Sequence, residues 1–279
     1  MEIDNSRGNI TEKIIDGKAI AQEIRRNLTI TPGQNPHLAV VLVGQNPASL
    51  VYIRNKENAC REVGIDFSLV NLPTETTEAT LLAEIHRLNS DPTITGILVQ
   101  QPLPSHINTH HAVLAIDPTK DVDCLHPTNL GLVATGHGKF APCTPGGIIT
   151  MLERVTDLAG KDVVIVGRSN IVGKPLGLML LGKNATVTTC HSHSKNLQDI
   201  TRRADILIVA IGHANFITPQ HVKPGAIVID VGMNRLPDGQ LCGDVDFAAV
   251  APIASHITPV PGGVGPMTIA TLLQNITKS

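Results

Sequence analysis

The sequence predicts an α/β protein with two domains, each built on a parallel sheet. Short apolar runs rich in Ile and Val alternate with segments of helical length, and Gly, Pro or Asn bounds each run. Such short, continuously apolar runs suit strands that are buried on both faces of a parallel sheet. The runs also fall into two groups, separated by the polar stretch 100–145. This alternation and grouping favour two α/β domains over one.

The expected elements follow one another along the chain. Strands are expected at 38–43, 67–72, 94–99, 163–166, 185–189, 206–210 and 226–229. Helices are expected at 47–63, 77–88 and 175–181, with a last one after Pro266. We place the domain boundary near residue 142, which gives domains of 1–142 and 143–265. The last helix, 266–279, is expected to pack on the first domain.

Charge and aromatic content exclude several functional classes. The 22 Lys and Arg against 24 Asp and Glu leave a net charge of −2, and Tyr52 is the sole tyrosine of a chain without tryptophan. Nucleic-acid binding needs a basic stripe or stacking rings, which this composition does not offer. No apolar run reaches the roughly 18 residues of a membrane span, and residues 1–5 lack the pattern of a signal segment. We expect a cytoplasmic protein without nucleic-acid or membrane partners.

The cysteines and histidines do not predict a metal site. Five cysteines, an odd number without a Cys-x-x-Cys pair, argue against a disulfide framework and against structural zinc. His191 and His193 flank a serine beside Cys190, but no carboxylate accompanies them. We expect no metal.

A lysine stands on the apolar face of the expected helix 47–63. Asn46 and Pro47 suit the start of this helix as a capping residue and a first-turn proline. At about 100° per residue, Lys56 is the only charge on an arc that otherwise looks buried, and Tyr52 lies one turn before it. The lysine stem could lie along apolar surface with its ammonium in water. Alternatively, a desolvated ammonium could exchange protons near neutral pH.

Two polar residues could form a site together with Lys56. Gln100 follows the third expected strand, and ligands of α/β sheets bind beyond the carboxyl ends of strands. A glutamine there can position a lysine without adding charge. Asp123, in the sequence Lys-Asp-Val-Asp, could accept hydrogen bonds from a heterocycle. Each residue is equally compatible with ordinary turn chemistry.

The segment after the fourth expected strand favours a dinucleotide phosphate. Its sequence at 167–173 reads as a turn into a helix, although Ser169 and Val172 replace two glycines of the standard fingerprint. An NAD site usually needs an acid near the end of the second strand. Here no acid occurs between 163 and 198, and 189–192 carries Thr, Cys, His and Ser. We therefore expect NADP, with a solvated basic face as the alternative.

A run rich in Gly and Pro, 258–268, precedes the last expected helix. Its glycines allow the backbone to approach a flat ligand, and its prolines stiffen the segment. A tight linker would have the same composition. Asp230 and Asp244 also lie near expected strand ends, where a structural role and a functional one both fit.

Together these motifs resemble the bifunctional methylenetetrahydrofolate dehydrogenase and methenyltetrahydrofolate cyclohydrolase family over nearly the whole chain. The matching motifs are Ser-x-x-Tyr-x-x-x-Lys at 49–56, Gly-Ile-Leu-Val-Gln at 96–100, Lys-Asp-Val-Asp at 120–123, Pro-Cys-Thr-Pro at 142–145, Gly-Arg-Ser-x-x-Val-Gly at 167–173, the run 185–192, the run 224–232 and Pro-Val-Pro-Gly-Gly-Val-Gly-Pro-Met-Thr at 259–268. So many matches in one order favour the functional interpretation of Lys56.

The resemblance implies roles for individual residues. Lys56 would be the general acid and base, Gln100 would hold and tune it, Tyr52 would stack on the folate, and Asp123 would bind the pterin. The further folate contacts that it implies are Ser49, Val99, Gln101, Pro261, Gly262, Gly263, Val264 and Gly265. The NADP contacts that it implies are Gly167, Arg168, Ser169, Ser192 and Met233.

The resemblance also implies a fold and an activity. A catalytic α/β domain would be joined to a Rossmann-type, doubly wound NADP domain, and two chains would form a homodimer. The enzyme would oxidise 5,10-methylenetetrahydrofolate with NADP and hydrolyse the methenyl product to 10-formyltetrahydrofolate, which serves purine biosynthesis.

Gln101 and Cys124 depart from the family's usual Leu and Gly, beside implied folate contacts. Another two-domain NADP dehydrogenase and a non-catalytic NADP sensor are the alternatives.

Overall fold

The computed structural model describes residues 10–279 with the exception of Pro32. Residues 1–5, whose composition argues against a signal segment, lie outside this range. The chain forms two compact units. Unit 1 combines the segment up to Ala21 with Thr144–Thr268, and unit 2 combines Gln22–Cys143 with Ile269–Ser279. None of the helices described between residues 10 and 279 has the length and apolar character that crossing a membrane requires.

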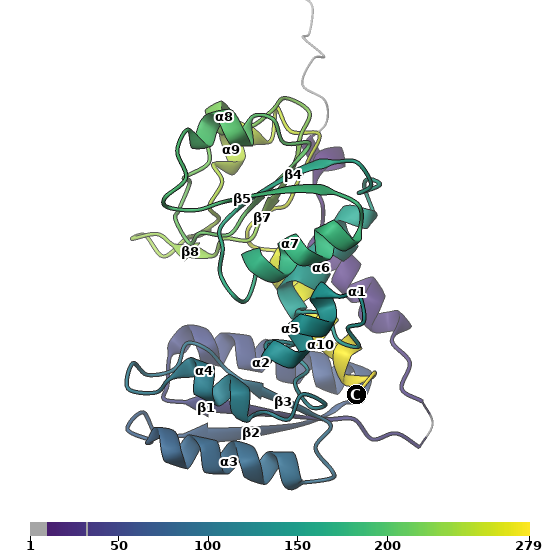
Figure 1. The fold of residues 1–279 in the computed structure, drawn as a ribbon, viewed down its shortest axis with the longest axis vertical. Helices are drawn as coiled ribbons and strands as arrows, with labels where there is room; N and C mark the ends of the chain where they lie inside the picture. The colour runs from purple at the N-terminus through teal and green to yellow at the C-terminus, as the bar shows by residue number, and fades with distance from the viewer. Residues whose placement is uncertain (1–9, 32) are drawn as a thin grey trace, which may run out of the picture. The chain divides into compact units, whose positions relative to one another are not determined.

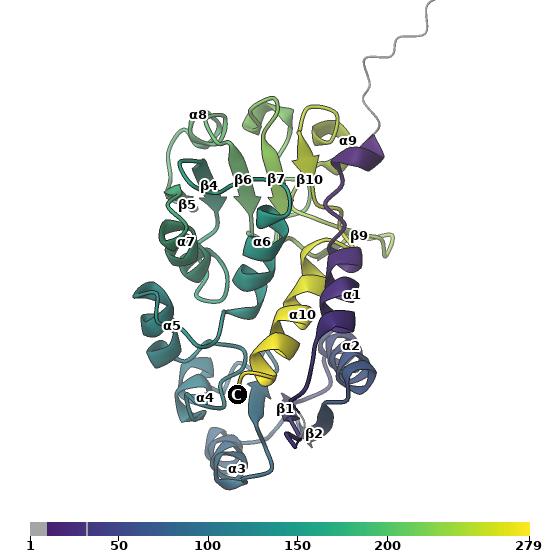
Figure 2. The same ribbon diagram turned by 90° about the vertical axis from the view of Figure 1, so that its right-hand side faces the viewer.

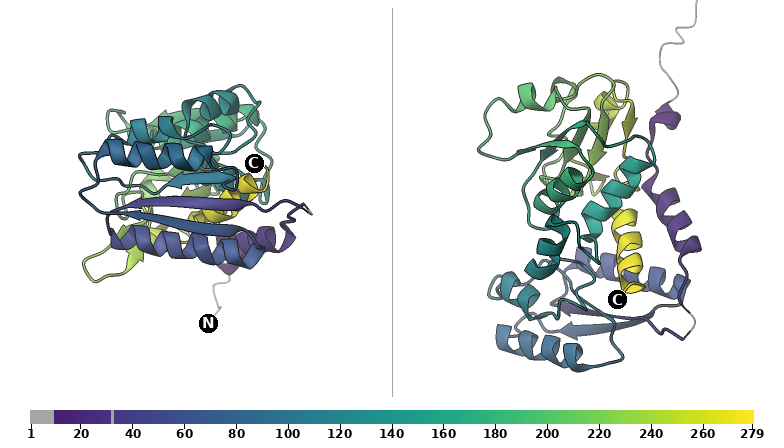
Figure 3. Two further views of the ribbon diagram at one scale, coloured as in Figure 1. Left: turned by 90° about the horizontal axis from the view of Figure 1, so that it is seen from below. Right: turned by 45° about the vertical axis from the view of Figure 1, so that its right-hand side comes forward.

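Unit 2 is a layered α/β unit around a three-stranded parallel sheet. The strands β1 (His37–Val43), β2 (Asp66–Leu72) and β3 (Gly96–Val99) lie in the order β2-β1-β3. Helices α2 (Pro47–Val63) and α3 (Glu78–Ser90) cover opposite faces of this sheet (Figure 1; Figure 3, left). The expected strands and helices of this half of the sequence are therefore present, with ends shifted by two residues or fewer.

The two faces of the unit 2 sheet have separate cores. One core joins β1 to α2 and to the end of α10 (Val264–Ile276), and includes Leu38, Val40, Leu42, Ile53, Ala59, Cys60, Leu272, Leu273 and Ile276. The other joins β1 and β3 to α3, and includes Ala39, Val41, Val43, Leu81, Ile85, Leu88, Ile97 and Val99. Because β1 is buried on both faces, its sequence is a continuous apolar run.

Local chemistry sets both ends of α2. The Asn46 side chain accepts hydrogen bonds from the N–H groups of Ala48 at 2.9 Å and Ser49 at 3.3 Å. Gly64 ends the helix with a left-handed φ of 76°, which glycine adopts without the steric cost that a Cβ would bring. These two caps set where α2 begins and ends, and the packing of Ile53, Ala59 and Cys60 against β1 sets which face of the helix is buried.

The polar stretch 100–145, which separates the two groups of expected strands, also contains helices. They are α4 (Thr109–Ala115), α5 (Pro127–Ala134) and the start of α6 (Cys143–Glu153). The other elements that the sequence analysis did not name are η1 (Ile10–Lys13), α1 (Gly17–Asn27), α8 (Leu197–Thr201), η2 (Pro219–His221), β8 (Asn234–Arg235), β9 (Leu241–Cys242), α9 (Phe247–Val250) and β10 (His256–Ile257). Most of these are too short to leave a periodic signal.

Unit 1 contains a five-stranded parallel sheet in the order β10-β7-β6-β4-β5, which Figure 2 shows side by side. Its longer strands are β4 (Asp162–Val166), β5 (Thr186–Cys190), β6 (Ile206–Val209) and β7 (Ile227–Asp230). The chain moves from β4 to β5 on one side and then to β6 on the other side of β4. The strand order therefore reverses at β4, and this switch point is where doubly wound sheets bind ligands.

The segment before Ala21 adds to the edge of the unit 1 sheet. Ile14 forms a parallel bridge with Ile257 of β10, and the N–H of Ile15 donates to the carbonyl of Ile257 at 2.9 Å. The expected limits of 1–142 and 143–265 had grouped this segment with the first domain. The partner strand β10 contains only two residues, which is too short to leave a pattern in the sequence that would predict this pairing.

Candidate active site

A buried lysine meets a glutamine in unit 2. Lys56 on α2 is only 8% exposed. Its Nζ donates a hydrogen bond of 2.9 Å to Oε1 of Gln100, the residue that follows β3. Gln100 Nε2 donates to the carbonyl of Gln101 at 2.7 Å, and because a carbonyl can only accept, this contact fixes which end of the amide faces the lysine. The ammonium is thus held by a neutral acceptor.

The surroundings of Lys56 favour its neutral form. Burial lowers the pKa of Lys56 from its ordinary value of 10.5, and the negative charge of Asp123 acts in the opposite direction. Burial likewise raises the pKa of Asp123, while the charge of Lys56 lowers it. A lysine with a lowered pKa can both accept and donate a proton at moderate pH.

Asp121 fixes the loop that carries Asp123. Its carboxylate is buried and accepts hydrogen bonds from the N–H of His126 at 2.8 Å and from Nδ2 of Asn129 at 2.9 Å. Within this loop, Cys124 has a left-handed φ of 58°, a conformation that glycine adopts more easily. The two carboxylates of the Lys-Asp-Val-Asp motif therefore differ, since Asp121 binds its own loop and Asp123 interacts with the charge of Lys56.

Two residues that the sequence analysis did not select complete this group. Cys143 Sγ donates to the carbonyl of Val122 at 3.4 Å, and burial, with the charge of Asp123, raises the pKa of the Cys143 thiol well above its ordinary value. Asn275 of α10 is fully buried, and its Nδ2 donates to the carbonyls of Val122 at 2.8 Å and Ala141 at 2.7 Å. The Pro-Cys-Thr-Pro motif was a signal for Cys143, whereas nothing in the sequence of α10 distinguished Asn275 from its neighbour Gln274.

The other implied folate contacts of unit 2 differ in exposure. Ser49 and Val99 are buried, and Gln101 is half-buried. Tyr52, expected within the buried arc of α2, is 37% exposed and lies at the edge of that arc. An exposed ring one turn from Lys56 can be reached by a ligand, whereas a core ring could not.

The glycine run before α10 belongs to unit 1. Gly262 has a left-handed φ of 108°, and its carbonyl accepts a hydrogen bond from Lys18 at 2.9 Å. A Cβ added to Gly263 would lie 2.6 Å from the carbonyl oxygen of Pro259, which is too close for any larger residue. Of the residues implied to bind folate, Val264 and Gly265 form the first turn of α10. This run therefore combines a tight turn with a helix start.

The carboxyl end of β4 has the shape of a dinucleotide turn. Gly167 has a φ of 128° and donates its N–H to the carbonyl of Cys190, the last residue of β5, at 2.9 Å. A Cβ at Gly173, the first residue of α7 (Gly173–Gly182), would overlap the carbonyl of Gly167. The two glycines allow the strand end and the helix start to approach closely, which is how such turns accommodate a pyrophosphate. The residues present therefore fit a dinucleotide.

The remaining implied NADP contacts follow the ends of strands in the same sheet. Arg168 and Ser169 follow β4, Ser192 follows β5, and Met233 follows β7; all four are exposed. Within the described residues, Arg168 makes no ion pair. A free guanidinium at this edge, with no acid at the end of β5, suits a 2′-phosphate better than a 2′-hydroxyl.

Within residues 10–31 and 33–279, no group of three His, Cys, Asp or Glu residues is arranged to hold a metal ion. His191 and His193 lie edge to face with their ring centres 6.0 Å apart. The backbone N–H of His193 donates to Nδ1 of His191 at 3.2 Å, so these residues form a local turn.

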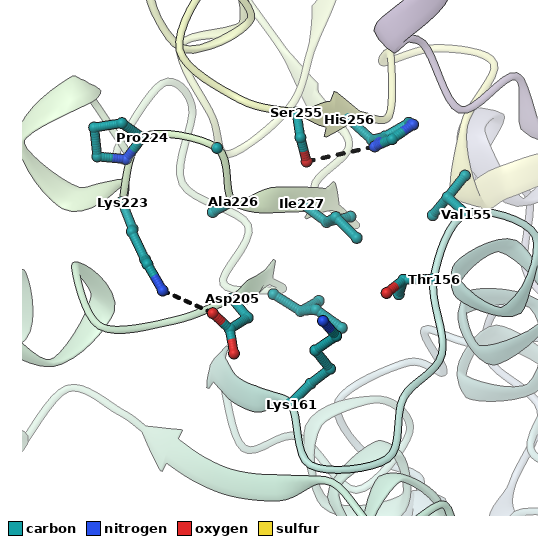
Figure 4. A pocket seen from close by; sticks show the side chains of 12 residues that line it. Val155, Thr156, Lys161, Asp205, Lys223, Pro224, Ala226, Ile227, Ser255 and His256 are labelled. Atoms are coloured by element: carbon teal, nitrogen blue, oxygen red, sulfur yellow. Dashed lines mark hydrogen bonds and ion pairs between the residues drawn. The ribbon is translucent and has the colours of Figure 1, made fainter.

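A second concavity of unit 1 lies at the opposite edge of the sheet. This pocket of about 260 Å³ is lined by residues at or before the starts of β4, β6, β7 and β10 (Figure 4). Lys223 Nζ bonds Asp205 Oδ1 at 2.7 Å across its mouth, and Ser255 lies against His256. Lys223 and Asp205 are thus paired with each other, Lys161 is the third charge of the lining, and the dinucleotide turn lies at the other ends of these strands.

Two family profiles match the chain. The "Tetrahydrofolate dehydrogenase/cyclohydrolase, catalytic domain" profile matches residues 15–123, and the "Tetrahydrofolate dehydrogenase/cyclohydrolase, NAD(P)-binding domain" profile matches residues 142–279. A "Bifunctional protein FolD" from Halalkalibacterium halodurans is 56% identical over 269 residues, which cover 94% of this chain and 96% of that protein. The two matched ranges together contain every residue implied to bind folate or NADP.

Solved structures agree with the two profiles. The crystal structure of the bifunctional enzyme FolD from Campylobacter jejuni is 47% identical, with a TM-score of 0.91 over 95% of this chain and 97% of that one. The Trypanosoma brucei enzyme, solved with NADP and an inhibitor, is 36% identical with a TM-score of 0.90, and the match covers 95% of this chain and 96% of that one. The chain therefore belongs to the tetrahydrofolate dehydrogenase/cyclohydrolase family.

Proposed function

We propose that the chain catalyses two successive reactions of one folate-bound carbon. It oxidises 5,10-methylenetetrahydrofolate to the 5,10-methenyl form with NADP, and it hydrolyses that product to 10-formyltetrahydrofolate. The observation that carries this proposal is the buried contact of Lys56 Nζ with Gln100 Oε1 at 2.9 Å, in a chain that matches both domains of the family. The product would supply one-carbon units for purine biosynthesis.

In the oxidation, the protein has to bind the folate and NADP and orient them for hydride transfer. Bound NADP would accept the hydride that leaves the methylene carbon of the substrate. No proton moves in this step, so Lys56 need not change its protonation state. The glycine turn at Gly167 would hold the pyrophosphate, and Arg168, with Ser169 and Ser192 beside it, would bind the 2′-phosphate.

The hydrolysis needs proton transfers, and we assign these transfers to Lys56. Neutral Lys56 would accept a proton from water as the water oxygen bonds to the methenyl carbon. The resulting ammonium would return a proton to N5 as the bond between N5 and that carbon breaks, and the hydroxyl proton would leave to solvent as the formyl group forms. Gln100 would bind the ammonium without the charge that a carboxylate would add. Asp123 would bind the pterin.

One assay tests this function against the two alternatives. The purified protein is given 5,10-methylenetetrahydrofolate and NADP, and the absorbance of NADPH and of the methenyl compound is followed. We expect NADPH to accumulate, and added methenyltetrahydrofolate to disappear without NADP. Binding of NADPH without turnover would favour a sensor. Oxidation of a hydroxy or amino acid, with no activity on the folate, would favour another dehydrogenase.

A homodimer is the proposed assembly, and the β2 edge offers a surface for it. Among the described strands, β2 pairs with β1 alone, and its Leu69 is 41% exposed. Unpaired strand edges with apolar side chains readily join another chain. The molar mass of the Leu69→Lys variant, measured by light scattering, should be that of a monomer. A variant that remains a dimer would exclude the β2 edge as the dimer interface. The near-neutral charge and the scarcity of aromatic rings support an enzyme that does not bind nucleic acid, and the odd number of cysteines supports a cytoplasmic location.

A further inference from the structure

Two carboxylates are buried at the carboxyl edge of the unit 1 sheet. Asp230 is the last residue of β7 and is 3% exposed, while Asp244, two residues after β9, is 0% exposed. No ion pair joins either one to a Lys or Arg in the described part of the chain. Burial raises the pKa of Asp230 to about 6, hydrogen bonds from backbone N–H groups lower it, and the charge of Asp244 raises it further. Buried charges of this kind need dense hydrogen bonding to persist.

Asp244 holds the loop after β6 and the segment after β7. Its Oδ2 accepts hydrogen bonds from the N–H groups of Ile211 at 2.7 Å and Gly212 at 3.0 Å. Its Oδ1 accepts from the N–H of His213 at 2.8 Å and from Nδ2 of Asn234 at 2.9 Å. One side chain therefore binds three consecutive backbone groups of the first segment and a side chain of the second.

Asp230 in turn holds Asp244. Its Oδ1 accepts from the N–H groups of Asp244 and Gly232, both at 2.9 Å, and its Oδ2 accepts from Val245 at 2.9 Å. Two glycines make this packing possible, because a Cβ at Gly232 would overlap the Asp244 carboxylate and a Cβ at Gly243 would overlap that of Asp230. The pair is thus a built arrangement that tolerates no larger residue at these two positions.

The loop that Asp244 holds lies against the dinucleotide turn. The N–H of Ala210 donates to the carbonyl of Val166 at 2.8 Å, and a Cβ at Gly167 would overlap the carbonyl of Ala210. The second segment contains Met233, which is 42% exposed and precedes Asn234. The 211–213 loop follows β6 and the Met233–Asn234 segment follows β7, at the same edge of the sheet as the end of β4. Both segments are held by the carboxylate of Asp244.

We infer that Asp244 is a positioning residue for NADP binding, acting through the 211–213 loop and the Met233–Asn234 segment, and that Asp230 fixes Asp244. This inference rests on the proposed NADP chemistry and adds residues for which the resemblance implies no role. Asp244 itself would contact no ligand. It would hold the loop against Gly167, so that the edge of the sheet is already arranged when the dinucleotide binds.

The variant Asp244→Asn tests this with little change of shape. Both carboxylate oxygens accept from N–H donors, so either orientation of the new amide places an NH₂ group against donors. Loss of a buried charge-assisted hydrogen bond should weaken NADPH binding by about tenfold or more. The control is Asp238→Asn, the same change in the turn between β8 and β9, where the exposed side chain accepts from Gln240. Asp238→Asn should bind NADPH as the unmodified protein does.

Three measurements separate positioning from general damage. The affinity for NADPH is measured from the change in its fluorescence on binding. The order of the loop is measured by hydrogen exchange at the backbone amides of Ile211, Gly212 and His213. Cyclohydrolase activity without NADP shows whether unit 2 is still correctly folded. We expect weaker affinity and faster exchange at these amides, with cyclohydrolase activity retained within about twofold. Unchanged NADPH affinity would overturn the inference, as would losses of affinity and cyclohydrolase activity in equal proportion.

A second variant covers the case in which Asp244→Asn does not fold. Asn234→Ala removes one of the four donors to Asp244 and leaves the three backbone bonds, so the protein should fold and bind NADPH about threefold more weakly. If Asn234→Ala binds NADPH normally and Asp244→Asn is unfolded, Asp244 is a residue of general stability and the inference fails. If the unmodified protein binds NADPH but does not oxidise the folate, only the proposed function fails.

Discussion

The chain buries charge in two places, and the two environments are opposites. In unit 2, the ammonium of Lys56 is 8% exposed and makes one hydrogen bond among the described residues, to the neutral Gln100. In unit 1, the carboxylate of Asp244 is 0% exposed and accepts four hydrogen bonds from the protein. An ammonium has three protons to donate, so Lys56 is incompletely bonded and Asp244 is saturated.

The difference indicates which charge can react. A buried carboxylate that accepts several backbone hydrogen bonds holds the segments that carry those donors in place. A buried ammonium with one neutral hydrogen-bond partner has a lowered pKa, so it gives up a proton more readily than an exposed lysine does. Burial alone therefore does not identify a catalytic group; the number and kind of its hydrogen bonds must be considered as well.

The sharpest test of this comparison replaces the reactive charge. Lys56→Met should lower cyclohydrolase activity by roughly a hundredfold to ten-thousandfold, since general acid and base catalysis contributes that much. Dehydrogenase activity should fall far less, because the hydride step moves no proton. Arg54→Met, an exposed charge on the opposite arc of α2, is the control and should retain both activities. Equal retention of both activities by Lys56→Met would exclude the assigned role.

The same variant predicts a change in the pH dependence of stability. Because the pKa of Lys56 is lowered in the folded state, the unfolded chain binds more protons than the folded one between that lowered value and 10.5. The free energy of unfolding should therefore gain a contribution from Lys56 as pH rises through this window. Urea denaturation at several pH values should show that increment in the unmodified protein and lack it in Lys56→Met.

Gln100→Glu would make the surroundings of Lys56 resemble an ordinary ion pair. A carboxylate in place of the amide favours the ammonium form and should move the pKa of Lys56 back upward. Cyclohydrolase activity near neutral pH should fall by about tenfold, since less of the neutral base is present. The pH profile should shift to higher pH, so that activity recovers in alkaline buffer. A reduced rate without a shifted profile would show that Gln100 acts on geometry alone.

Asn275→Ala tests whether the Asp123 loop depends on α10. The change leaves the carbonyls of Val122 and Ala141 without this donor, which should lower the free energy of unfolding by about 2 kcal/mol. The KM for the folate should rise several-fold while NADPH affinity stays the same. Gln274→Ala, on a half-buried position of the same helix, is the matched control. A change in NADPH affinity equal to that in KM would contradict the assignment.

Tyr52→Ala should have the smallest effect on the fold. The ring is 37% exposed, so its removal should alter stability little, yet a lost stacking contact should weaken folate binding by about threefold to tenfold. Leu50→Ala provides the comparison, because Leu50 is 38% exposed on the same helix and outside the arc of Lys56. Equal folate affinity in the two variants would assign Tyr52 to packing.

The sequence predicted the sheet strands and α2 well because their signals are local. A continuous apolar run identified β1, and Asn46 with Pro47 marked the start of α2. The arc that held Lys56 also held Ser49, which is buried as expected. Tyr52 is more exposed than expected because an arc drawn from helical periodicity does not locate the edge of the covering sheet.

What the sequence missed depends on contacts between distant segments. Asn275 lies in an apolar helix and becomes informative only when its amide is seen to bind Val122 and Ala141. Asp244 could be placed near a strand end, but its four donors come from loops that follow two other strands. The strand β10 contains two residues, too few for any periodic signal.

The bridge between Ile14 and Ile257 affects how the protein can fold while the ribosome synthesises it. The segment up to Ala21 leaves the exit tunnel early but must wait for Ile257 before its partner strand exists. Unit 2 waits as well, because Leu272, Leu273 and Asn275 complete its core and its Asp123 loop. Neither unit can therefore complete its core until the residues from Ile257 to Ile276 have been synthesised, and incompletely folded chains of this kind expose apolar surface to which chaperones bind.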